Sequence, residues 1–259
     1  MIVEEYVLDQ ADYTWGDSRR AERIGKGFLL RVFGDAPGRP SYTLSTQPEG
    51  FVNPAHFHNK PQFQVIWSGS VSFPTHELAT IAVHYTDASF PYGPFVVGSD
   101  LLLGVYRPRI ANQIYMSDRD GRKQRNPYGR EFSGAADPRQ FFGQSSDGAW
   151  ERAADAQRLV LIDAGQCGPG AELVRYEPGA LVQRVPAPFG EFVVVADGEA
   201  HLGAARLGQY SARWTRGDTA SELLRAGPDG LTVLALTYDA AAEPFYTDDA
   251  VMVANQPAP

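Results

Sequence analysis

The stretch from Gly50 to Gly69 constrains the fold of this chain more than any other. It reads GFVNPAHFHNKPQFQVIWSG, so His56 and His58 are separated by one residue. Side chains alternate between the two faces of a β-strand, so both imidazoles share one face if this segment is a strand. The following Asn-Lys-Pro favours a turn, after which Gln62 can approach the histidines. Two imidazole nitrogens and an amide oxygen can together bind a metal ion, although they bring no negative charge.

This spacing resembles the first motif of the cupin family, G-x5-H-x-H-x3-E-x6-G, with Gln62 in place of the usual glutamate. The resemblance implies a jelly-roll β-barrel whose motif side chains point into the barrel mouth. Many cupins bind Fe, Mn, Ni or Zn there, whereas others use the barrel without a metal. In the family's second motif, Val96 stands where a third histidine belongs. The expected metal ligands are therefore His56, His58 and Gln62, with His84 as a possible fourth.

The motif spacing recurs at a constant offset of 129 residues, from Gly50 to Gly179 and from Gly69 to Gly198. An internal match at one offset indicates a duplicated architecture, and the resemblance then implies a bicupin with two barrels in one chain. The second copy holds Val185 and Ala187 at the histidine positions, and it keeps a glutamate, Glu191. We expect that barrel to hold no metal and to act as scaffold, interface or dry pocket. We also expect Glu191 to be hydrogen-bonded to Arg184 or to a backbone amide.

The rest of the chain alternates short strand patterns with turns, in keeping with its 26 glycines and 19 prolines. Short helices are expected only near Asp17–Gly25 and Trp150–Gln157. The sequence therefore predicts an all-β fold of two jelly-roll barrels. The expected units are an N-terminal arm (1–25), a first barrel with the candidate site (26–116), a connection (117–156), a second barrel (157–240) and a C-terminal tail (241–259).

The composition of the chain limits which partners and which cellular compartment are expected. The formal net charge of −8 argues against nucleic acid, and no apolar run is long enough to span a membrane. One cysteine excludes an intramolecular disulfide and is typical of a reducing compartment, and no signal peptide is visible, so the prediction is cytoplasmic. The resemblance implies that barrels pair edge to edge, which a two-barrel chain can satisfy internally, so a monomer or a homodimer is expected.

The candidate substrate-binding residues are polar or aromatic positions near the motif: Gln64, Tyr92, Tyr106, Arg107 and Arg109, with Tyr85 considered beside them. Arg107 and Arg109 alternate along a strand, so both guanidinium groups share a face and would favour a carboxylate or phosphate if that face is the cavity. Exposed arginines on an outer face are the commoner arrangement. Phe63 and Trp67 fall on the face opposite to Gln62 and are expected to pack between sheets or barrels.

Three functions are compatible with these residues. The first is a metal-dependent enzyme of isomerase, lyase or dioxygenase type, acting on a small organic molecule in the first barrel. The second is a metal-free bicupin that binds a small molecule without catalysis. The third is metal-free acid–base catalysis by His56 or His58 with a tyrosine, oriented by Gln62.

Overall fold

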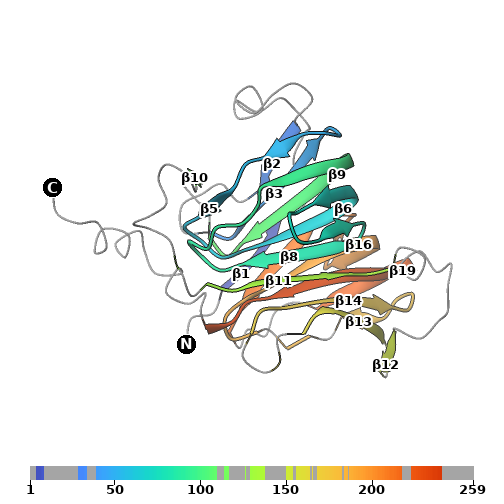
Figure 1. Ribbon diagram of the computed structural model, residues 1–259. Coiled ribbons are helices and arrows are strands. Elements are labelled where there is room, and N and C mark those ends of the chain that lie inside the picture. Colours follow the sequence, from blue (N-terminus) through green and yellow to red (C-terminus); the bar gives the residue numbers. More distant parts are fainter. Residues whose placement is uncertain are drawn as a thin grey trace.

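The computed structural model describes residues 4–8, 29–33, 39–109, 114–116, 126, 129–137, 150–153, 156–163, 165, 168–182, 184, 185, 187–217 and 223–240. All nineteen elements in these ranges are β-strands, which confirms the all-β class (Figure 1). The first eleven are β1 (Glu4–Leu8), β2 (Leu29–Phe33), β3 (Ser41–Gln47), β4 (Val52–Asn53), β5 (His56–His58), β6 (Gln62–Ser72), β7 (Glu77–Ala79), β8 (Ala82–Thr86), β9 (Phe95–Arg107), β10 (Ile114–Met116) and β11 (Glu131–Ala135). The others are β12 (Glu151–Ala153), β13 (Ala156–Ile162), β14 (Gly170–Tyr176), β15 (Leu181–Val182), β16 (Glu191–Leu202), β17 (Ala205–Leu207), β18 (Ala212–Arg216) and β19 (Leu224–Thr237).

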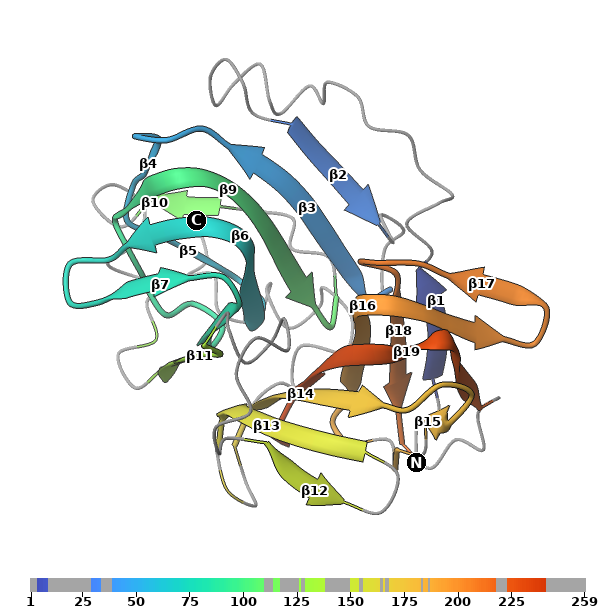
Figure 2. The same ribbon diagram turned by 90° about the vertical axis from the view of Figure 1, so that its right-hand side faces the viewer.

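The strands form two large antiparallel sheets with matching connectivity (Figure 2). The first has the order β11-β8-β6-β9-β3-β2, with β4 on β9 and β7 on β6, while β5 pairs separately with β10. The second has the order β1-β18-β16-β19-β14-β13-β12, with β15 on β19 and β17 on β16. The long strands β6 and β9, like β16 and β19, carry register shifts that bend them around a barrel. The fold is therefore two jelly-roll barrels, in agreement with the duplication predicted from the 129-residue offset.

One edge strand is exchanged between the two halves. β1 precedes the first barrel in sequence but pairs with β18 of the second sheet. Conversely, β11 precedes the second barrel but pairs with β8 of the first sheet. The sequence interpretation assigned these segments to an arm (1–25) and a connection (117–156), because a pairing over so long a sequence separation leaves no local signal. As a result, residues of β11 belong to the first barrel.

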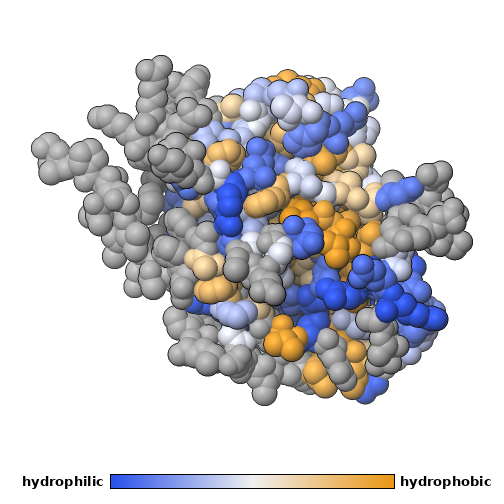
Figure 3. All heavy atoms as spheres, turned by 60° about the horizontal axis from the view of Figure 1, so that its bottom comes forward, coloured by the Kyte–Doolittle hydropathy of each residue, from blue (hydrophilic) through white to orange (hydrophobic). Residues whose placement is uncertain are grey.

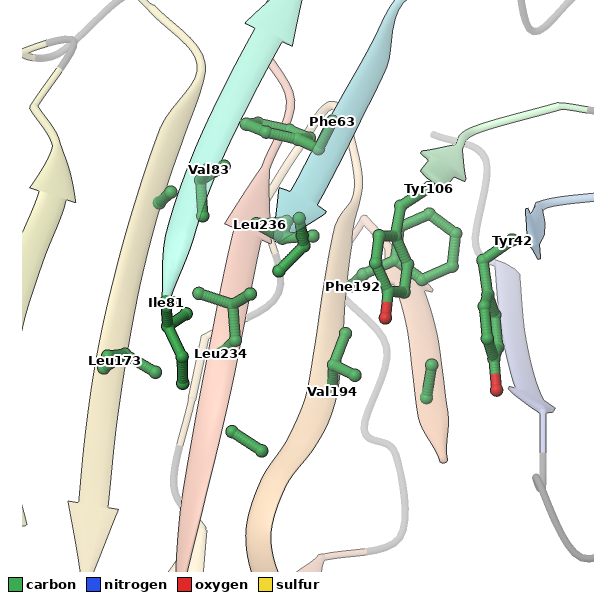
Figure 4. Close-up of a cluster of buried hydrophobic side chains, with 14 of the residues drawn as sticks. Tyr42, Phe63, Ile81, Val83, Tyr106, Leu173, Phe192, Val194, Leu234 and Leu236 are labelled. Carbon is green, nitrogen blue, oxygen red and sulfur yellow. The ribbon is translucent and has the colours of Figure 1, made fainter. Parts of the chain in front are cut away.

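The two sheets face one another across one large hydrophobic cluster (Figure 4). Its largest members from the first sheet are Tyr42, Phe63, Trp67, Tyr85 and Tyr106, and those from the second are Leu173, Phe192, Trp214, Leu236 and Tyr238. Strand alternation explains the division, because Phe63, Val65 and Trp67 point into this cluster while Gln62 and Gln64 point the other way. The prediction that Phe63 and Trp67 pack between the barrels is confirmed. Smaller clusters fill the inside of each barrel.

Arg130 joins the two barrels at the edge of this core. Its Nε and Nη2 donate to the Asp87 carboxylate at 2.9 and 3.0 Å, and its Nη1 lies 2.6 Å from Asp239 Oδ2 in the second half. Tyr85 Oη donates to the same Asp87 carboxylate at 2.9 Å. One guanidinium therefore compensates two nearly buried carboxylates on opposite barrels, which fixes their relative position.

The short helix expected near Trp150–Gln157 is wrong, because β12 and the start of β13 occupy that segment as an antiparallel pair. The helix expected at Asp17–Gly25, Cys167 and the tail 241–259 lie outside the described residues. Within the described ranges, no helix has the length and apolar character needed to cross a membrane. Hydrophobic and hydrophilic side chains both reach the surface (Figure 3). Among the described residues, the exposed large hydrophobic ones are Val52, Val96, Val160, Val185 and Leu223.

Candidate functional site

The two motif histidines lie side by side on β5. Their ring centroids are 5.3 Å apart and their rings meet edge to face. His58 is 7% exposed, whereas His56 is more accessible. The chain then turns into β6 and presents Gln62, which is 1% exposed, on the same side of the barrel. Arg107 of β9 contacts both Gln62 and His58, so the three expected ligand side chains do come together.

The closing glycine of the motif is required by the backbone in both barrels. Gly69 has φ +80°, and a Cβ there would lie 2.3 Å from the carbonyl oxygen of Asp100. Gly198 has φ +77°, and a Cβ there would lie 2.4 Å from the carbonyl oxygen of Gly230. Both positions sit at bulges where the two long strands approach closely, and only glycine adopts this conformation without strain.

Arg107 fixes the hydrogen-bond directions around it because a guanidinium group can only donate. Its Nε donates to Gln62 Oε1 at 3.1 Å, and its Nη2 donates to His58 Nε2 at 3.4 Å. The amide nitrogen of Gln62 must therefore face away from Arg107. His58 Nε2 must be an acceptor, so this ring is neutral in the structure.

Tyr92 lies at the centre of the site. Its hydroxyl oxygen accepts from Gln62 Nε2 at 2.7 Å and from Gln64 Nε2 at 3.2 Å, and it lies 2.7 Å from His56 Nε2. With both lone pairs engaged, the hydroxyl donates to His56, whose Nδ1 in turn donates to the Pro54 carbonyl oxygen at 2.6 Å. Burial raises the pKa of Tyr92 to about 12, although Arg107 and the two amides act to lower it. Tyr92 is thus a protonated donor, and His56 is neutral.

His84 contacts the site through Gln64. The fully buried ring places Nδ1 2.8 Å from Gln64 Oε1 and Nε2 2.6 Å from Glu131 Oε1. His84 therefore links the amide of Gln64 to the carboxylate of Glu131. The hydrogen bond from His84 is the main cause that lowers the pKa of the Glu131 carboxyl. We call the eight linked side chains the polar cluster: His56, His58, Gln62, Gln64, His84, Tyr92, Arg107 and Glu131.

The donor set of this cluster fits a divalent metal ion poorly. The coordinating atom of each expected ligand already accepts a hydrogen bond: His56 Nε2 from Tyr92, and both Gln62 Oε1 and His58 Nε2 from Arg107. Arg107 also places a permanent positive charge among these atoms, and none of the three expected ligands is a carboxylate. No group of three or more His, Cys, Asp or Glu in the described ranges is arranged to hold a metal.

The remaining candidates fall into two groups. Gln64, Tyr92 and Arg107 belong to the polar cluster, and Arg109 is buried just beyond it, with Nη1 donating to the Pro108 carbonyl oxygen. Tyr106 lies elsewhere: it is fully buried in the core between the barrels and stacks on Tyr42 with centroids 5.0 Å apart. Alternation along β9 forces this, because Tyr106 pairs with Phe63 on the opposite face from Arg107. Tyr85 is on the same inter-barrel face.

The second barrel has a different arrangement at the motif level. Glu191 is 2% exposed, and its carboxylate accepts from Arg184 Nε at 3.0 Å and from Thr237 Oγ1 at 3.2 Å. Arg184 Nη1 also donates to Glu172 at 2.7 Å. The expected hydrogen bond between Glu191 and Arg184 is therefore confirmed. Val185, at a histidine position, is 89% exposed.

Comparison with known proteins bears on the fold. No protein-family model matches the sequence, and no curated protein matches it. Solved structures do: a candidate dioxygenase from Nostoc punctiforme superposes with a TM-score of 0.64 over 92% of this chain and 84% of its own, at 13% identity. Pumpkin seed globulin superposes with a TM-score of 0.55 over 90% of this chain and 85% of its own, at 12% identity. Oxalate decarboxylase from Bacillus subtilis, which has Mn(II) centres, superposes with a TM-score of 0.53 over 91% of this chain and 77% of its own, at 10% identity.

These matches extend over both barrels. The chain has the fold of a bicupin. Identities this low establish the architecture of the bicupin and leave its chemistry to its own residues. The matched proteins include a seed globulin and an enzyme with metal centres, so one architecture serves different roles.

Sequence reasoning missed Glu131 as a member of the site. It lies in the segment interpreted as a connection, and it reaches His84 only because β11 is exchanged into the first sheet. The five residues of the strand Glu131–Ala135, EFSGA, carry no pattern that identifies a partner.

Proposed function

We propose that the first barrel of this bicupin binds a small polar organic molecule at the polar cluster without a metal. The supporting observation is the bonding of Arg107, which supplies a fixed cation where a metal ion would need vacant acceptors. The ligand meets the cluster at His56, its accessible motif histidine. Binding without turnover and acid–base catalysis are the two forms of this proposal.

The pair formed by His56 and Tyr92 supplies the acid–base chemistry of the second form. His56 is neutral and can accept a proton at Nε2, while Tyr92 donates a hydrogen bond to that nitrogen. Imidazole ordinarily titrates near neutrality, which suits a general base. Gln62 and Gln64 hold Tyr92 in place through its hydroxyl oxygen. The two amides are therefore positioning residues for the pair.

Elemental analysis tests the metal-free proposal directly. Protein purified without chelators or an affinity metal should contain no stoichiometric Fe, Mn, Ni or Zn. Its melting temperature should not rise when these metals are added, because a ligand specific for the native state must stabilise it. A stoichiometric metal that disappears in His56→Ala and His58→Ala would contradict the proposal.

A metal-dependent enzyme of isomerase, lyase or dioxygenase type is the second candidate. The adjacent rings of His56 and His58 favour it, as does the shared fold with the Mn(II)-containing oxalate decarboxylase. It requires Arg107 to leave Gln62 and His58, so that these atoms become available. The same elemental analysis decides between the two candidates.

A further inference from the structure

We infer that the ion bridge centred on Arg130 positions Tyr92, so that Asp239 of the second barrel helps to hold the site in the first. Arg130 and Asp239 are positioning residues in this arrangement, because they reach the polar cluster only through other residues. The inference rests on the proposed function in one respect, which is that the polar cluster is the site. It is carried by residues 87–92, which join the bridge to the cluster and which we call the Tyr92 loop.

The first residue of the Tyr92 loop is fixed by Arg130. Asp87 Oδ2 accepts from the backbone nitrogen of Arg130 at 2.8 Å and from its Nε at 2.9 Å, while Oδ1 accepts from its Nη2 at 3.0 Å. The backbone nitrogen of Asp87 donates in turn to the Arg130 carbonyl oxygen at 3.0 Å. Hydrogen bonds in both directions therefore join these two residues, and those that end on the carboxylate are of the strong, charge-assisted kind.

The segment before β11 clamps the middle of the Tyr92 loop. The backbone nitrogen of Asn126 donates to the Ser89 carbonyl oxygen at 2.9 Å. Gly129 lies against Phe90, because a Cβ at position 129 would be only 2.6 Å from the Phe90 Cβ. On its other side the loop meets β5, where the backbone nitrogen of Ser89 donates to the His58 carbonyl oxygen at 2.7 Å. The loop is therefore enclosed between the segment that leads to the ion bridge and the strand of the motif histidines.

Tyr92 ends the loop and pairs with the motif backbone. Its backbone nitrogen donates to the His56 carbonyl oxygen at 3.0 Å, and its carbonyl oxygen accepts from the backbone nitrogen of His56 at 3.1 Å. Ser89, between the two ends, has φ +60°, a left-handed conformation that is unfavourable for serine. Such a conformation persists only where the contacts around it maintain it, so release of Asp87 should let the loop relax and move Tyr92. The contact from Gln64 Nε2 to the Tyr92 hydroxyl, at 3.2 Å, should be lost first.

The second barrel enters this arrangement through Asp239. Its Oδ2 lies 2.6 Å from Arg130 Nη1, and its side chain is 5% exposed. The hydrogen bonds to Asp87 and then to Asp239 raise the pKa of Arg130, so the guanidinium is charged while it holds both. β11 also approaches β13 of the second barrel closely, because a Cβ at Gly134 would overlap the carbonyl oxygen of Leu161. The position of Arg130 therefore depends on the second barrel, and the position of the loop depends on Arg130.

NMR of the histidine side chains tests the inference on the full-length protein, which contains 5 histidines. Selective labelling of histidine with the heavy nitrogen isotope gives signals for each ring, and single substitutions assign them. The variants Arg130→Gln and Asp239→Asn break the bridge from either side, and Gly129→Ala presses on the loop without changing a charge. If circular dichroism shows that Arg130→Gln does not fold, Asp239→Asn and Gly129→Ala carry the test.

The ring signals of His56 should move in all three variants toward their positions in Tyr92→Phe, because the hydroxyl that donates to Nε2 is displaced. The matched control is Glu199→Gln, which removes the carboxylate beside His201 in the second barrel. It should move the signals of His201 and leave those of His56 in place. A folded protein that is merely less stable keeps the wild-type His56 signals, so this measurement separates positioning from stability.

Amide hydrogen exchange measures the loop itself. The Ser89 amide should lose protection about 10- to 100-fold in Arg130→Gln, the range for loss of a hydrogen bond to a charged group. In Asp239→Asn the loss should be about 2- to 5-fold, the range for a partly exposed ion pair, because Arg130 keeps Asp87. The amide of Leu234, in the core between the barrels, should lose less protection than that of Ser89 in each variant.

Wild-type His56 signals in the bridge variants would overturn the inference, and the bridge would then only join the barrels. Equal losses of protection at Ser89 and Leu234 would overturn it too, because they would reflect unfolding of the whole molecule. A stoichiometric metal in the purified protein would instead overturn the proposed function. Exchange of the Ser89 amide would still decide in that case whether the bridge holds the loop.

Discussion

The two barrels of this protein share a strand order and differ in the side chains that contact the buried arginine at the motif. In the second barrel, Arg184 lies between the carboxylates of Glu191 and Glu172. In the first barrel, Arg107 lies between an amide and a neutral imidazole. The comparison indicates that duplication preserved the strand order and the motif glycines. The side chains that contact the buried arginine differ: two carboxylates in the second barrel, and an amide and an imidazole in the first.

The exchange of edge strands adds a second lesson. Each barrel is completed by a strand from the other half of the sequence, so neither half is an independent unit. The shared core and the Arg130 bridge reinforce this dependence. A substitution in the second barrel is therefore expected to lower the stability of the whole molecule, including the site in the first barrel.

The largest loss of stability is expected from Arg184→Ala, which removes the arginine of the ion pairs in the second barrel. This substitution leaves two carboxylates without their shared cation, and the side chain of Glu191 is only 3% exposed. Removal of one partner of a buried ion pair costs about 3–5 kcal/mol. Urea denaturation should show this loss in the free energy of unfolding. Arg206→Ala, which removes an exposed arginine from the same barrel, should change it little. Similar small losses in both variants would mean that the Arg184 pairs are not structural.

An intermediate loss of stability is expected at low pH. Burial raises the pKa of Glu172, but Arg184 and Arg158 outweigh it, so the folded-state pKa lies below the ordinary value of 4.5. His84 lowers that of Glu131 in the first barrel. A lowered carboxyl pKa stabilises the fold above the unfolded-state value, and this contribution is lost as the pH falls through the folded-state value. The free energy of unfolding should therefore decrease as the pH is lowered below about 4.5.

Two variants assign this acid sensitivity to the barrels. Glu172→Gln should flatten the dependence of unfolding free energy on pH more than Glu131→Gln, because the Glu131 side chain is 35% exposed and that of Glu172 is 13% exposed. Urea titrations at several values between pH 3 and pH 7 measure both slopes. A wild-type slope in both variants would show that other carboxylates control acid unfolding.

The parts of the structure that depend on local spacing could be predicted from the sequence. The H-x-H pair, the turn after it and the alternation along β6 placed His56, His58 and Gln62 together and sent Phe63 and Trp67 to the opposite face. The repeated spacing of glycines predicted two barrels, because a positive φ at a bulge selects glycine in each copy.

The parts of the structure that depend on pairing between distant strands could not be predicted from the sequence. Glu131 reaches His84 through the exchanged β11, and no pattern near either residue records that contact. Tyr106 was assigned to the site although its neighbour Arg107 belongs there, because the facing of β9 is set by its register with β6. The role of Arg107 could not be predicted either, since only the structure shows that this side chain contacts Gln62 and His58.

The smallest change in stability, and the sharpest test of the comparison, is expected from Gln62→Glu. It gives the first barrel the carboxylate that the second barrel has at Glu191, next to Arg107 instead of Arg184. The cost of burying the new charge is offset by its pairing with Arg107, so the free energy of unfolding should change by about 1 kcal/mol or less. Urea denaturation measures this change, and Gln157→Glu on half-buried β13 of the second barrel controls for an added carboxylate. A loss of several kcal/mol would mean that Arg107 does not offset a carboxylate at position 62. If Gln62→Glu gains affinity for Mn(II) that the wild type lacks, the amide at position 62 is what separates this barrel from a metal site.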